Sequence, residues 1–492
     1  MTLAPSHQRR LNGNRGVLLL LLLLLLSFLF SSCELFKKVP REDGGTTRTG
    51  EELEEISGGE RVYNPKTGQY EYQNTGGPQM DTIQWTVNPP NEAPPITSNG
   101  GVLIGGDKPE TNPTGGGSQM RDRYRVAILL PFLTDRFDTG RGKPDPKSLL
   151  ALNYYYGAKM AFDELAKEGI QLDINTFDTK ASEAEVSRLL QSPEVSEADL
   201  ILGPIRKSNL SATANFAKQN GITMVSPLSP STDITADNPY FVQTTPSLVS
   251  HCEAITRHVL DRYRSDQVTL VARNKEAEIQ RLKYFQDANY AIGGRNARSF
   301  DEFVVSDNTA DFNEMDVTPQ IREGDTTVFI VPSWSNESFI YSFLRKVKVA
   351  KGDNTVIIYG MPQWMDFQII SYDYYEELNV HVSSAYFVDN DATVAQEFRR
   401  RFFDRYGMVP TREAYAGFDQ VRLLGRSLKR HGTLFQTQLG RESQNFLSTR
   451  YNFQPVVSRI GIVTEDYSKV DRFENKYVNI LRFKDYFFQL AQ

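Results

Sequence analysis

The chain has 492 residues, of which 24% are charged and 11% aromatic, a composition that supports a packed core and is typical of about two to four domains. Its 55 basic and 61 acidic residues give a formal net charge of −6, so it lacks the basic excess that nucleic-acid-binding proteins usually carry. The two cysteines, Cys33 and Cys252, are too few for a disulfide scaffold or a four-cysteine zinc site.

The first 32 residues have the pattern of a secretory signal. Three arginines and no acidic residue stand among residues 1–16, and residues 17–30 form a nearly unbroken apolar run. This run is shorter than the roughly 20 residues that a membrane-spanning helix needs. We therefore expect residues 1–32 to be removed as a signal peptide; the alternative is a signal anchor that stays in the membrane.

Cys33 ends a short motif that resembles a bacterial lipobox. The segment Leu29-Phe30-Ser31-Ser32-Cys33 matches it apart from Phe30, where leucine or valine is more usual. In such motifs the cysteine is diacylated and becomes the mature N-terminus, and multiple acyl chains anchor stably at about 0.8 kcal/mol per buried CH2. The resemblance implies lipidation of Cys33 and a place in the bacterial cell envelope, at the outer membrane and facing the periplasm.

Cys252 has no intramolecular partner once Cys33 carries lipid. It lies in a helix-like stretch at 248–255, and the simplest interpretation is a buried cysteine that fills space in the core. The alternative, a nucleophile paired with a histidine, requires a nearby base and a lowered thiol pKa.

Residues 33–122 are expected to form the lipidated cysteine and a flexible tether. Paired glycines and prolines recur there, and such a composition buries too little apolar surface to fold. A Gly-rich coil of this length spans roughly 50 Å on average. Within it, residues 61–72 alternate apolar and polar side chains around Asn-Pro-Lys-Thr-Gly, which predicts a small hairpin. Because an isolated hairpin is marginally stable, this island is either a docking segment that orders on a partner or inert linker.

From residue 123 on, strands and helices alternate. The expected order is strand 125–131, helix 148–168, strand 171–177, helix 181–192, strand 199–202, a helix that ends at 220, and strand 222–226. Strands that alternate with helices of roughly 10 to 20 residues indicate βαβ units and a parallel sheet.

The pattern restarts near residue 247. Strands are expected at 267–272, 302–305, 327–331 and 355–359, and helices at 275–288, 311–321, 336–348, 393–406 and 411–430. The two halves predict an α/β fold of two doubly wound parallel-sheet lobes with a hinge. Lobe 1 is expected at 123–246 plus part of 390–435, and lobe 2 at 247–389 plus the C-terminal segments. Because ligands bind outside the carboxyl ends of parallel strands, facing lobes predict an interlobe cleft.

Five segments in this order resemble the type 1 periplasmic binding-protein family, of the leucine/isoleucine/valine-binding kind. They are Val126–Pro131, Tyr156–Ala161, Leu202-Gly203-Pro204 with Ser208, Ser226–Ser247, and Phe398–Asp419. The resemblance covers about residues 124–435. It implies the type 1 periplasmic binding fold, in which two lobes close around a ligand by a hinge motion.

The resemblance also implies how a ligand would be held. Amino-acid binders of this family hold the ligand's carboxylate with backbone N–H groups and a Ser or Thr hydroxyl at helix N-termini. Ser208 stands at the first such turn. The second turn has Pro230 where those binders have threonine, and proline offers neither an N–H nor a hydroxyl. Ser229 and Ser231 flank it as substitutes, and the departure leaves a solute other than an α-amino acid open.

On the other lobe, candidate contacts follow the predicted strands. Arg273 is a candidate for pairing with an anion, and Trp334 and Trp364 are candidates for stacking on a ligand. The alternative for both tryptophans is packing between lobe and loop. The full predicted set of ligand contacts is Pro131, Tyr155, Ser208, Ser229, Ser231, Arg273, Trp334, Trp364 and Tyr386.

The sequence offers no pattern for catalysis, for a metal or for a cofactor. His251 and His258 are seven residues apart and lack the i, i+4 spacing of a zinc site. No phosphate-cradling loop and no Gly-x-Ser-x-Gly segment occurs. We therefore expect a protein that is not an enzyme and holds neither metal nor cofactor.

Two functions remain in view. The first is a solute-binding lipoprotein that binds a small polar ligand, such as an amino acid or a peptide, in the interlobe cleft for the permease of an ABC-type transporter. The second is a regulatory lipoprotein that binds and activates a cell-envelope enzyme. The long tether, the island at 61–72 and Pro230 support it, since together they resemble lipoprotein activators of peptidoglycan synthases. The resemblance favours solute binding.

Overall fold

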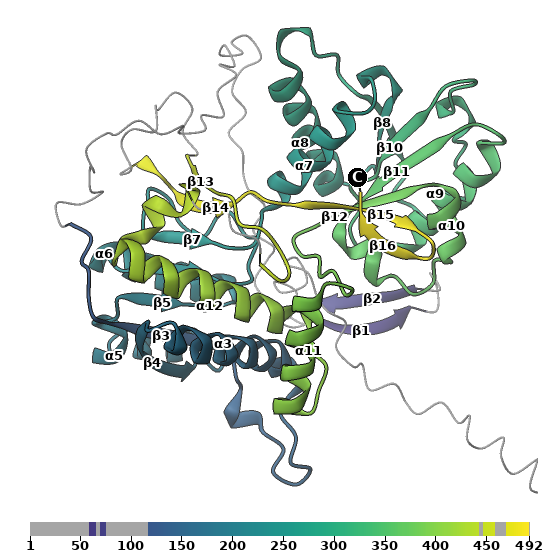
Figure 1. Ribbon diagram of the computed structural model, residues 1–492. Helices are drawn as coiled ribbons and strands as arrows, with labels where there is room; N and C mark the ends of the chain where they lie inside the picture. Colours follow the sequence, from purple (N-terminus) through teal and green to yellow (C-terminus); the bar gives the residue numbers. More distant parts are fainter. Residues whose placement is uncertain (1–58, 65–68, 75–116, 442–445, 458–468, 492) are drawn as a thin grey trace, which may run out of the picture. The chain divides into compact units, whose positions relative to one another are not determined.

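The computed structural model describes residues 59–64, 69–74, 117–441, 446–457 and 469–491 (Figure 1). The predicted signal peptide, Cys33 and most of the tether lie outside these residues, so lipidation and the tether boundaries stay predictions. Within the described ranges, no helix is both long and apolar enough to cross a membrane.

The hairpin predicted in the tether is confirmed. β1 (Gly59–Asn64) and β2 (Gln69–Asn74) pair antiparallel, with Tyr63 opposite Tyr70. Each strand continues two residues beyond the predicted island, which began at 61 and ended at 72. The alternation of residue types was therefore a sound local signal for this pairing.

Lobe 1 is built on a seven-stranded sheet with the order β13-β14-β7-β6-β5-β3-β4. Its strands are β3 (Arg123–Leu130), β4 (Gln171–Asp178), β5 (Leu200–Leu202), β6 (Thr223–Ser226), β7 (Phe241–Gln243), β13 (Phe453–Val456) and β14 (Arg472–Asn475). Neighbours from β4 to β14 run parallel, and β13 pairs antiparallel at the edge. The carboxyl ends of β3, β5 and β6 therefore meet at one edge of this sheet.

Lobe 2 is built on a second seven-stranded sheet, with the order β16-β15-β12-β11-β10-β8-β9. Its strands are β8 (Val268–Arg273), β9 (Asp301–Val305), β10 (Thr327–Ile330), β11 (Val356–Gly360), β12 (Val380–Ser384), β15 (Asn479–Lys484) and β16 (Phe487–Leu490). The first five run parallel, and β15 and β16 add antiparallel pairs. Both predicted parallel sheets are thus mixed, because C-terminal strands that the sequence analysis did not assign complete them.

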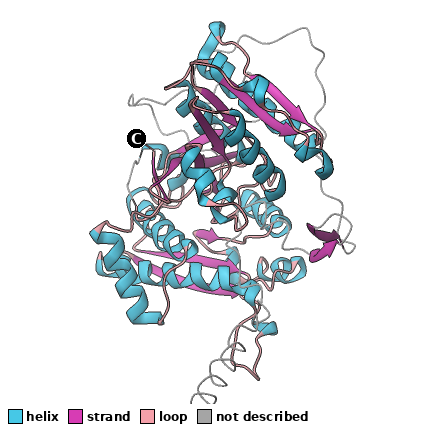
Figure 2. Ribbon diagram, turned by 90° about the vertical axis from the view of Figure 1, so that its right-hand side faces the viewer, coloured by secondary structure: helices cyan, strands magenta, loops and turns pink. Residues whose placement is uncertain are grey.

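Helices cover the faces of both sheets (Figure 2). They are α3 (Leu149–Lys167), α4 (Glu183–Leu189), α5 (Pro193–Ser196), α6 (Lys207–Asn220), α7 (Leu248–Leu260), α8 (Glu276–Gly293), α9 (Glu337–Ala350), α10 (Tyr372–Glu377), α11 (Thr393–Tyr406) and α12 (Arg412–His431). The helix predicted at 311–321 is wrong, since two 3-10 turns stand there: η6 (Thr309–Asn313) and η7 (Thr318–Gln320). The Asp316 carboxylate accepts a hydrogen bond from the Thr318 N–H at 2.9 Å, and Pro319 has no N–H to donate, so a continuous helix cannot form.

α3 and α12 lie side by side and approach each other closely (Figure 1). A Cβ on Gly157 of α3 would lie 1.8 Å from the Ala414 carbonyl oxygen. A Cβ on Gly417 of α12 would lie 2.0 Å from the Tyr154 carbonyl oxygen, so only glycine permits this approach. The Tyr154 hydroxyl then donates to Gln420 Oε1 at 2.8 Å. Two of the five segments that carry the family resemblance thus serve helix packing.

The chain passes between the two sheets three times, at 244–247, 385–392 and 476–478. Hydrogen bonds link the residues around these crossovers: Asn475 Nδ2 to the Thr244 carbonyl at 3.1 Å, Asn479 Nδ2 to the Ser384 carbonyl at 3.3 Å, and Thr245 Oγ1 with the Tyr386 hydroxyl at 3.3 Å. The three crossovers form the hinge region that joins the lobes.

Candidate functional site

Ser208 lies in the first turn of α6, just outside the carboxyl end of β5. The chain turns there through Gly203, where a Cβ would lie 2.1 Å from the Leu129 carbonyl oxygen and φ is 95°, so only glycine fits. Ser208 is exposed, and Arg206 at the N-cap provides no side-chain cap. The hydroxyl and the first N–H groups of α6, at the positive end of the helix dipole, therefore suit a polar ligand.

The turn after β6 carries Ser229 and Ser231, and local hydrogen bonds occupy part of it. Ser229 is buried, and its Oγ accepts from the Ser231 N–H at 3.3 Å. The Pro227 carbonyl accepts from Thr244 Oγ1 at 2.8 Å and from Gln420 Nε2 at 2.9 Å, which fixes the turn. The Ser229 hydroxyl can still donate its proton to a ligand. Ser229 and half-buried Ser231 are therefore the residues that could take over the role of the threonine that Pro230 replaces.

Three further predicted contacts are Pro131 and Tyr155 in lobe 1 and Tyr386 in the hinge region. Pro131 follows β3, and Tyr155 on α3 packs edge-to-face against Phe132 with 5.5 Å between ring centroids. Tyr386 lies on the second crossover, where burial raises the pKa of its phenol and its hydroxyl meets Thr245. All three predicted side chains are half-buried, so each retains some exposed surface.

Arg273 at the end of β8 is held by carboxylates. Its guanidinium lies 2.6 Å from Glu278 Oε1 and 2.6 Å from Asp307 Oδ1, and the residue is 8% exposed. Ser333 donates a further hydrogen bond to Glu278 Oε1 at 2.8 Å. Burial raises the pKa of Glu278, but the hydrogen bonds and the charge of Arg273 outweigh burial and hold that pKa below its usual value. A ligand anion would therefore have to displace Asp307 to reach Arg273.

Both predicted stacking residues of lobe 2 are buried. Trp364 is fully buried, and its Nε1 donates to the Ser333 carbonyl at 2.9 Å. Its ring lies against Gly360, where a Cβ would come within 2.3 Å of the indole. Trp334 is 6% exposed, has the Arg281 guanidinium 5.7 Å from its ring centroid, and has no hydrogen-bond partner for Nε1 among the residues described. Both tryptophans thus belong to the hydrophobic core of lobe 2, and stacking on a ligand stays a prediction for each.

The structure gathers the predicted residues into two groups. On lobe 1, β5 and β6 are neighbours, so the turns with Ser208 and Ser229 lie next to each other. An ion pair between Lys207 Nζ and Asp233 Oδ2, at 2.6 Å, joins the start of α6 to the segment that follows the second turn. On lobe 2, Arg273 ends β8, and the two tryptophans follow β10 and β11; β10 lies between β8 and β11 in the sheet.

A buried charged centre beside the first crossover was not predicted from the sequence. Glu474 on β14 is fully buried, and its Oε1 accepts from the Ser247 N–H at 3.1 Å and from Ser250 Oγ at 2.6 Å. Burial raises the pKa of Glu474, but the charges of Lys476 and Arg472 and these hydrogen bonds lower it to about 2. The carboxylate thereby meets the N-terminus of α7 and ties it to the sheet of lobe 1. No local signal marked this glutamate, because the alternating charges around it resemble an exposed segment.

Cys252 and the nearby histidine fill structural positions. Cys252 is fully buried and burial raises the pKa of its thiol, which confirms the predicted core cysteine. His251 Nδ1 lies 2.9 Å from Ser383 Oγ, and burial lowers the pKa of His251 to about 4. No cluster of three or more His, Cys, Asp or Glu side chains that could hold a metal ion occurs in the described part of the chain.

Three solved structures share the fold of this chain. A putative branched-chain amino acid ABC transporter from Rhodospirillum rubrum gives a TM-score of 0.54 at 14% identity, covering 74% of this chain and 99% of that one. A branched-chain amino acid ABC transporter periplasmic ligand-binding protein from Burkholderia xenovorans gives 0.51 at 11%, covering 75% and 94%. Full-length LpoA from Haemophilus influenzae gives 0.51 at 13%, covering 76% of this chain and 60% of LpoA. Such identities show the fold alone.

The sequence comparison is more specific. A search of curated proteins finds no match. Residues 146–445, more than half of the chain, match the sequence pattern of the family described as periplasmic binding protein. The match spans elements of both lobes, from the start of α3 to the segment after α12. The chain therefore belongs to the periplasmic binding protein family.

Proposed function

We propose that this protein is a membrane-anchored solute-binding lipoprotein that binds a small polar ligand between its lobes for the permease of an ABC-type transporter. The observation that carries the proposal is the pair of neighbouring turns after β5 and β6, where α6 begins with exposed Ser208. N–H groups and a hydroxyl at the positive end of a helix suit a carboxylate or another polar oxygen. Family membership supports solute binding in the periplasm or cell envelope.

The charges of lobe 2 narrow the class of ligand. Since Arg273 already pairs with two carboxylates, it is not free to take a second acidic group of a ligand. A solute with its acidic or polar end on lobe 1 and a neutral remainder near Tyr155 and Tyr386 fits this arrangement. Amino acids, short peptides and other polar solutes have this character, whereas dianions do not.

Thermal unfolding tests the solute-binding role. The chain without residues 1–33 would be unfolded in the presence of amino acids, peptides, nucleosides and muropeptides. A ligand at 100 times its Kd adds about 2.7 kcal/mol to the free energy of unfolding. We expect Ser208→Ala to weaken binding about tenfold, the loss of one hydrogen bond to a charged group. Ser211→Ala, on the same helix, is the control and should bind normally. If no solute raises the unfolding midpoint, the transport role fails.

Lipidation is a separate part of the proposal. We expect mass spectrometry of the N-terminal peptide, taken from protein in bacterial membranes, to show a diacylated Cys33. Cys33→Ser should release the protein from the membrane fraction. Retention of this variant in the membrane would instead support a signal anchor formed by residues 17–30.

A regulatory lipoprotein that activates a peptidoglycan synthase is the second candidate. The paired Arg273 and the proline at position 230 favour it, because each removes a polar group that a solute would use. Co-purification with cell-wall synthases separates the two functions. The regulatory role predicts binding to a synthase that needs no added solute and persists in Ser208→Ala.

A further inference from the structure

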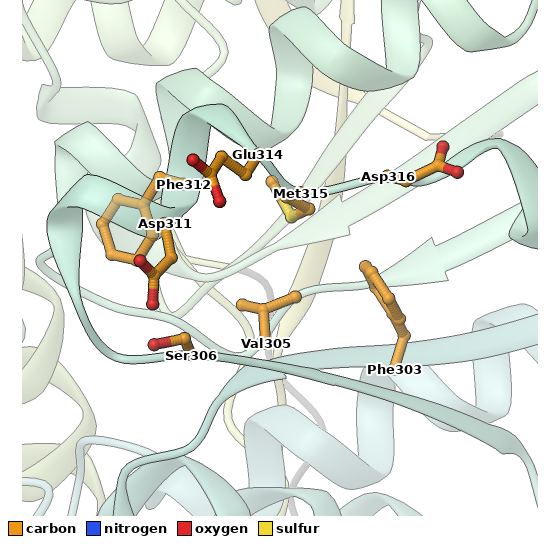
Figure 3. A pocket seen from close by; sticks show the side chains of 8 residues that line it. All are labelled: Phe303, Val305, Ser306, Asp311, Phe312, Glu314, Met315 and Asp316. Atoms are coloured by element: carbon orange, nitrogen blue, oxygen red, sulfur yellow. The ribbon is translucent and has the colours of Figure 1, made fainter.

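A hollow of about 280 Å³ opens in lobe 2 beside β9 (Figure 3). Two residues of β9 and several residues of the segment around η6 line it, and none of them belongs to the predicted ligand contacts. β9 is the last strand of its sheet and pairs only with β8 in the described part of the chain. The hollow therefore lies at an open edge of the sheet.

The hollow exists because 3-10 turns replace a helix after β9. Phe312 and Met315 point into the protein, at 2% and 7% exposed, and Phe312 packs against Phe339 with 5.3 Å between ring centroids. These turns leave Phe303 and Val305 of β9 only half-buried. The lining thus includes an apolar surface that a continuous helix would have covered.

Two carboxylates at one end of the hollow lack a cation. Figure 3 shows the oxygens of Ser306, Asp311 and Glu314 at one end, and Asp316 at the other. Nearby Asp307 is paired with an arginine. In the ranges that the structure covers, no lysine, arginine or histidine lies within ion-pair distance of Asp311 or Glu314. Asp311 and Glu314 therefore have no ion-pair partner among the described residues. At the other end, hydrogen bonds from Thr318 and the charge of Lys346 lower the pKa of Asp316.

We propose that this hollow binds the lysine side chain of an extended segment in a partner protein. The donors of an ammonium group would bind the carboxylates of Asp311 and Glu314, while the four-carbon stem would lie along Phe303 and Met315. The volume of about 280 Å³ is below the roughly 300–1,000 Å³ of pockets for drug-sized ligands, and it has room for a lysine side chain. An extended partner fits because the edge of β9 offers backbone N–H and C=O groups for strand addition.

The proposal is tested with a blocked pentapeptide, Val-Thr-Lys-Thr-Val, and the mature chain carrying a ¹³C-labelled Met315 methyl group. We expect a saturable shift of that NMR signal. A peptide with norleucine in place of lysine keeps the stem and removes the charge, and it should bind at least tenfold more weakly. Glu314→Gln should weaken the lysine peptide about tenfold, whereas Glu323→Gln, exposed in the same lobe outside the hollow, should not.

Equal affinities for the lysine and norleucine peptides overturn the proposal, as does unchanged binding by a folded Glu314→Gln protein. n-Pentylamine is the second probe, since it carries the charge and a stem without a peptide backbone. If it shifts the Met315 signal at the same concentration as the peptide, the ligand is a free amine and the partner-strand part is wrong. These outcomes can be distinguished from a failure of solute binding, because Ser208 does not line the hollow. Ser208→Ala should therefore bind the lysine peptide normally.

Discussion

The two lobes differ in the side chains that lie beyond the carboxyl ends of their parallel strands. After β5, lobe 1 presents an exposed serine at an uncapped helix N-terminus. After β8 and β10, lobe 2 has a buried network in which Arg273, Glu278 and Ser333 satisfy one another. One fold can thus keep the ends of its strands open for a ligand or close them with internal ion pairs. Strand ends that are closed by internal ion pairs can bind a charged ligand only after those ion pairs break.

Breaking the closed network of lobe 2 is expected to have the largest effect. Arg273→Met leaves Glu278 buried without its cation, which should cost about 3–5 kcal/mol of the free energy of unfolding measured in urea. Arg264→Met removes two exposed ion pairs, with Asp266 and Asp325, and is the control, with an expected cost of about 1 kcal/mol or less. A cost below about 1 kcal/mol for Arg273→Met would show that the network does not support lobe 2.

In lobe 1, stability depends instead on the close contact of α3 and α12. Gly417→Ala places a Cβ 2.0 Å from the Tyr154 carbonyl oxygen, a backbone atom that cannot move aside. We expect a loss of about 1–3 kcal/mol in urea unfolding. Gly425→Ala on the same helix meets the flexible Leu165 side chain at 2.4 Å. Its gain in helix propensity, about 1 kcal/mol, should offset most of that strain. Equal losses would mean that backbone approach is not the cause.

Local sequence patterns predict the first four strands of each lobe and miss the later ones, β7, β12 and β13 to β16, which complete one side of each sheet. β3 to β6 and β8 to β11 begin and end within two residues of their expected positions. Each is a short apolar or alternating segment next to a helix whose apolar residues recur every three to four positions. β14 escapes this reasoning, since Arg472 and Glu474 resemble an exposed segment although both are buried. The buried carboxylate of Glu474 is stabilised by the N–H of Ser247, which lies 227 residues earlier in the chain. A prediction from neighbouring residues cannot include so distant a partner.

The candidate site shows the same limit. The rule that ligands bind beyond strand ends selects positions such as Arg273 and Trp364 but says nothing of what surrounds them. Glu278 stands only five residues after Arg273, so their pairing could have been considered from sequence. The burial of Trp364 against Gly360 could not, because it depends on how the chain returns after β11. Residue type and position were thus predictable, whereas partners and exposure required the structure.

Acidification is expected to act on the two lobes with opposite sign. Burial lowers the pKa of His251 to about 4, so its contribution to stability is full above about pH 6.5 and is lost as the pH falls toward 4. In lobe 1, burial raises the pKa of Asp419 to about 6 despite hydrogen bonds from Ser448 and Leu447. The folded state then holds that proton more tightly, so this group adds stability as the pH falls from about 6 toward about 4.

Hydrogen exchange in α7 and α12 measures this difference at pH 7 and pH 5. Corrected for intrinsic rates, protection of α7 should fall by at least about 2 kcal/mol, and that of α12 should rise by about 1 kcal/mol. His251→Gln should remove only part of the change in α7, because burial also lowers the pKa of His258 on the same helix, and it should leave α12 alone. A change of the same sign in both helices would contradict the opposite roles assigned to these two groups.

The smallest change in the free energy of unfolding is expected for Ser208→Ala in lobe 1. Its counterpart in lobe 2 is Ser333→Ala, since both serines follow the carboxyl ends of strands. Ser333 is buried and donates to Glu278, so Ser333→Ala should cost about 1–2 kcal/mol, whereas exposed Ser208→Ala should stay within about 0.5 kcal/mol. A bound solute should change this order. At 100 times the wild-type Kd, wild type and Ser333→Ala each gain about 2.7 kcal/mol, but Ser208→Ala, tenfold weaker, gains only about 1.4 kcal/mol. If both variants gain equally from the solute, the open turn of lobe 1 does not bind it, and the contrast between the lobes is one of stability alone.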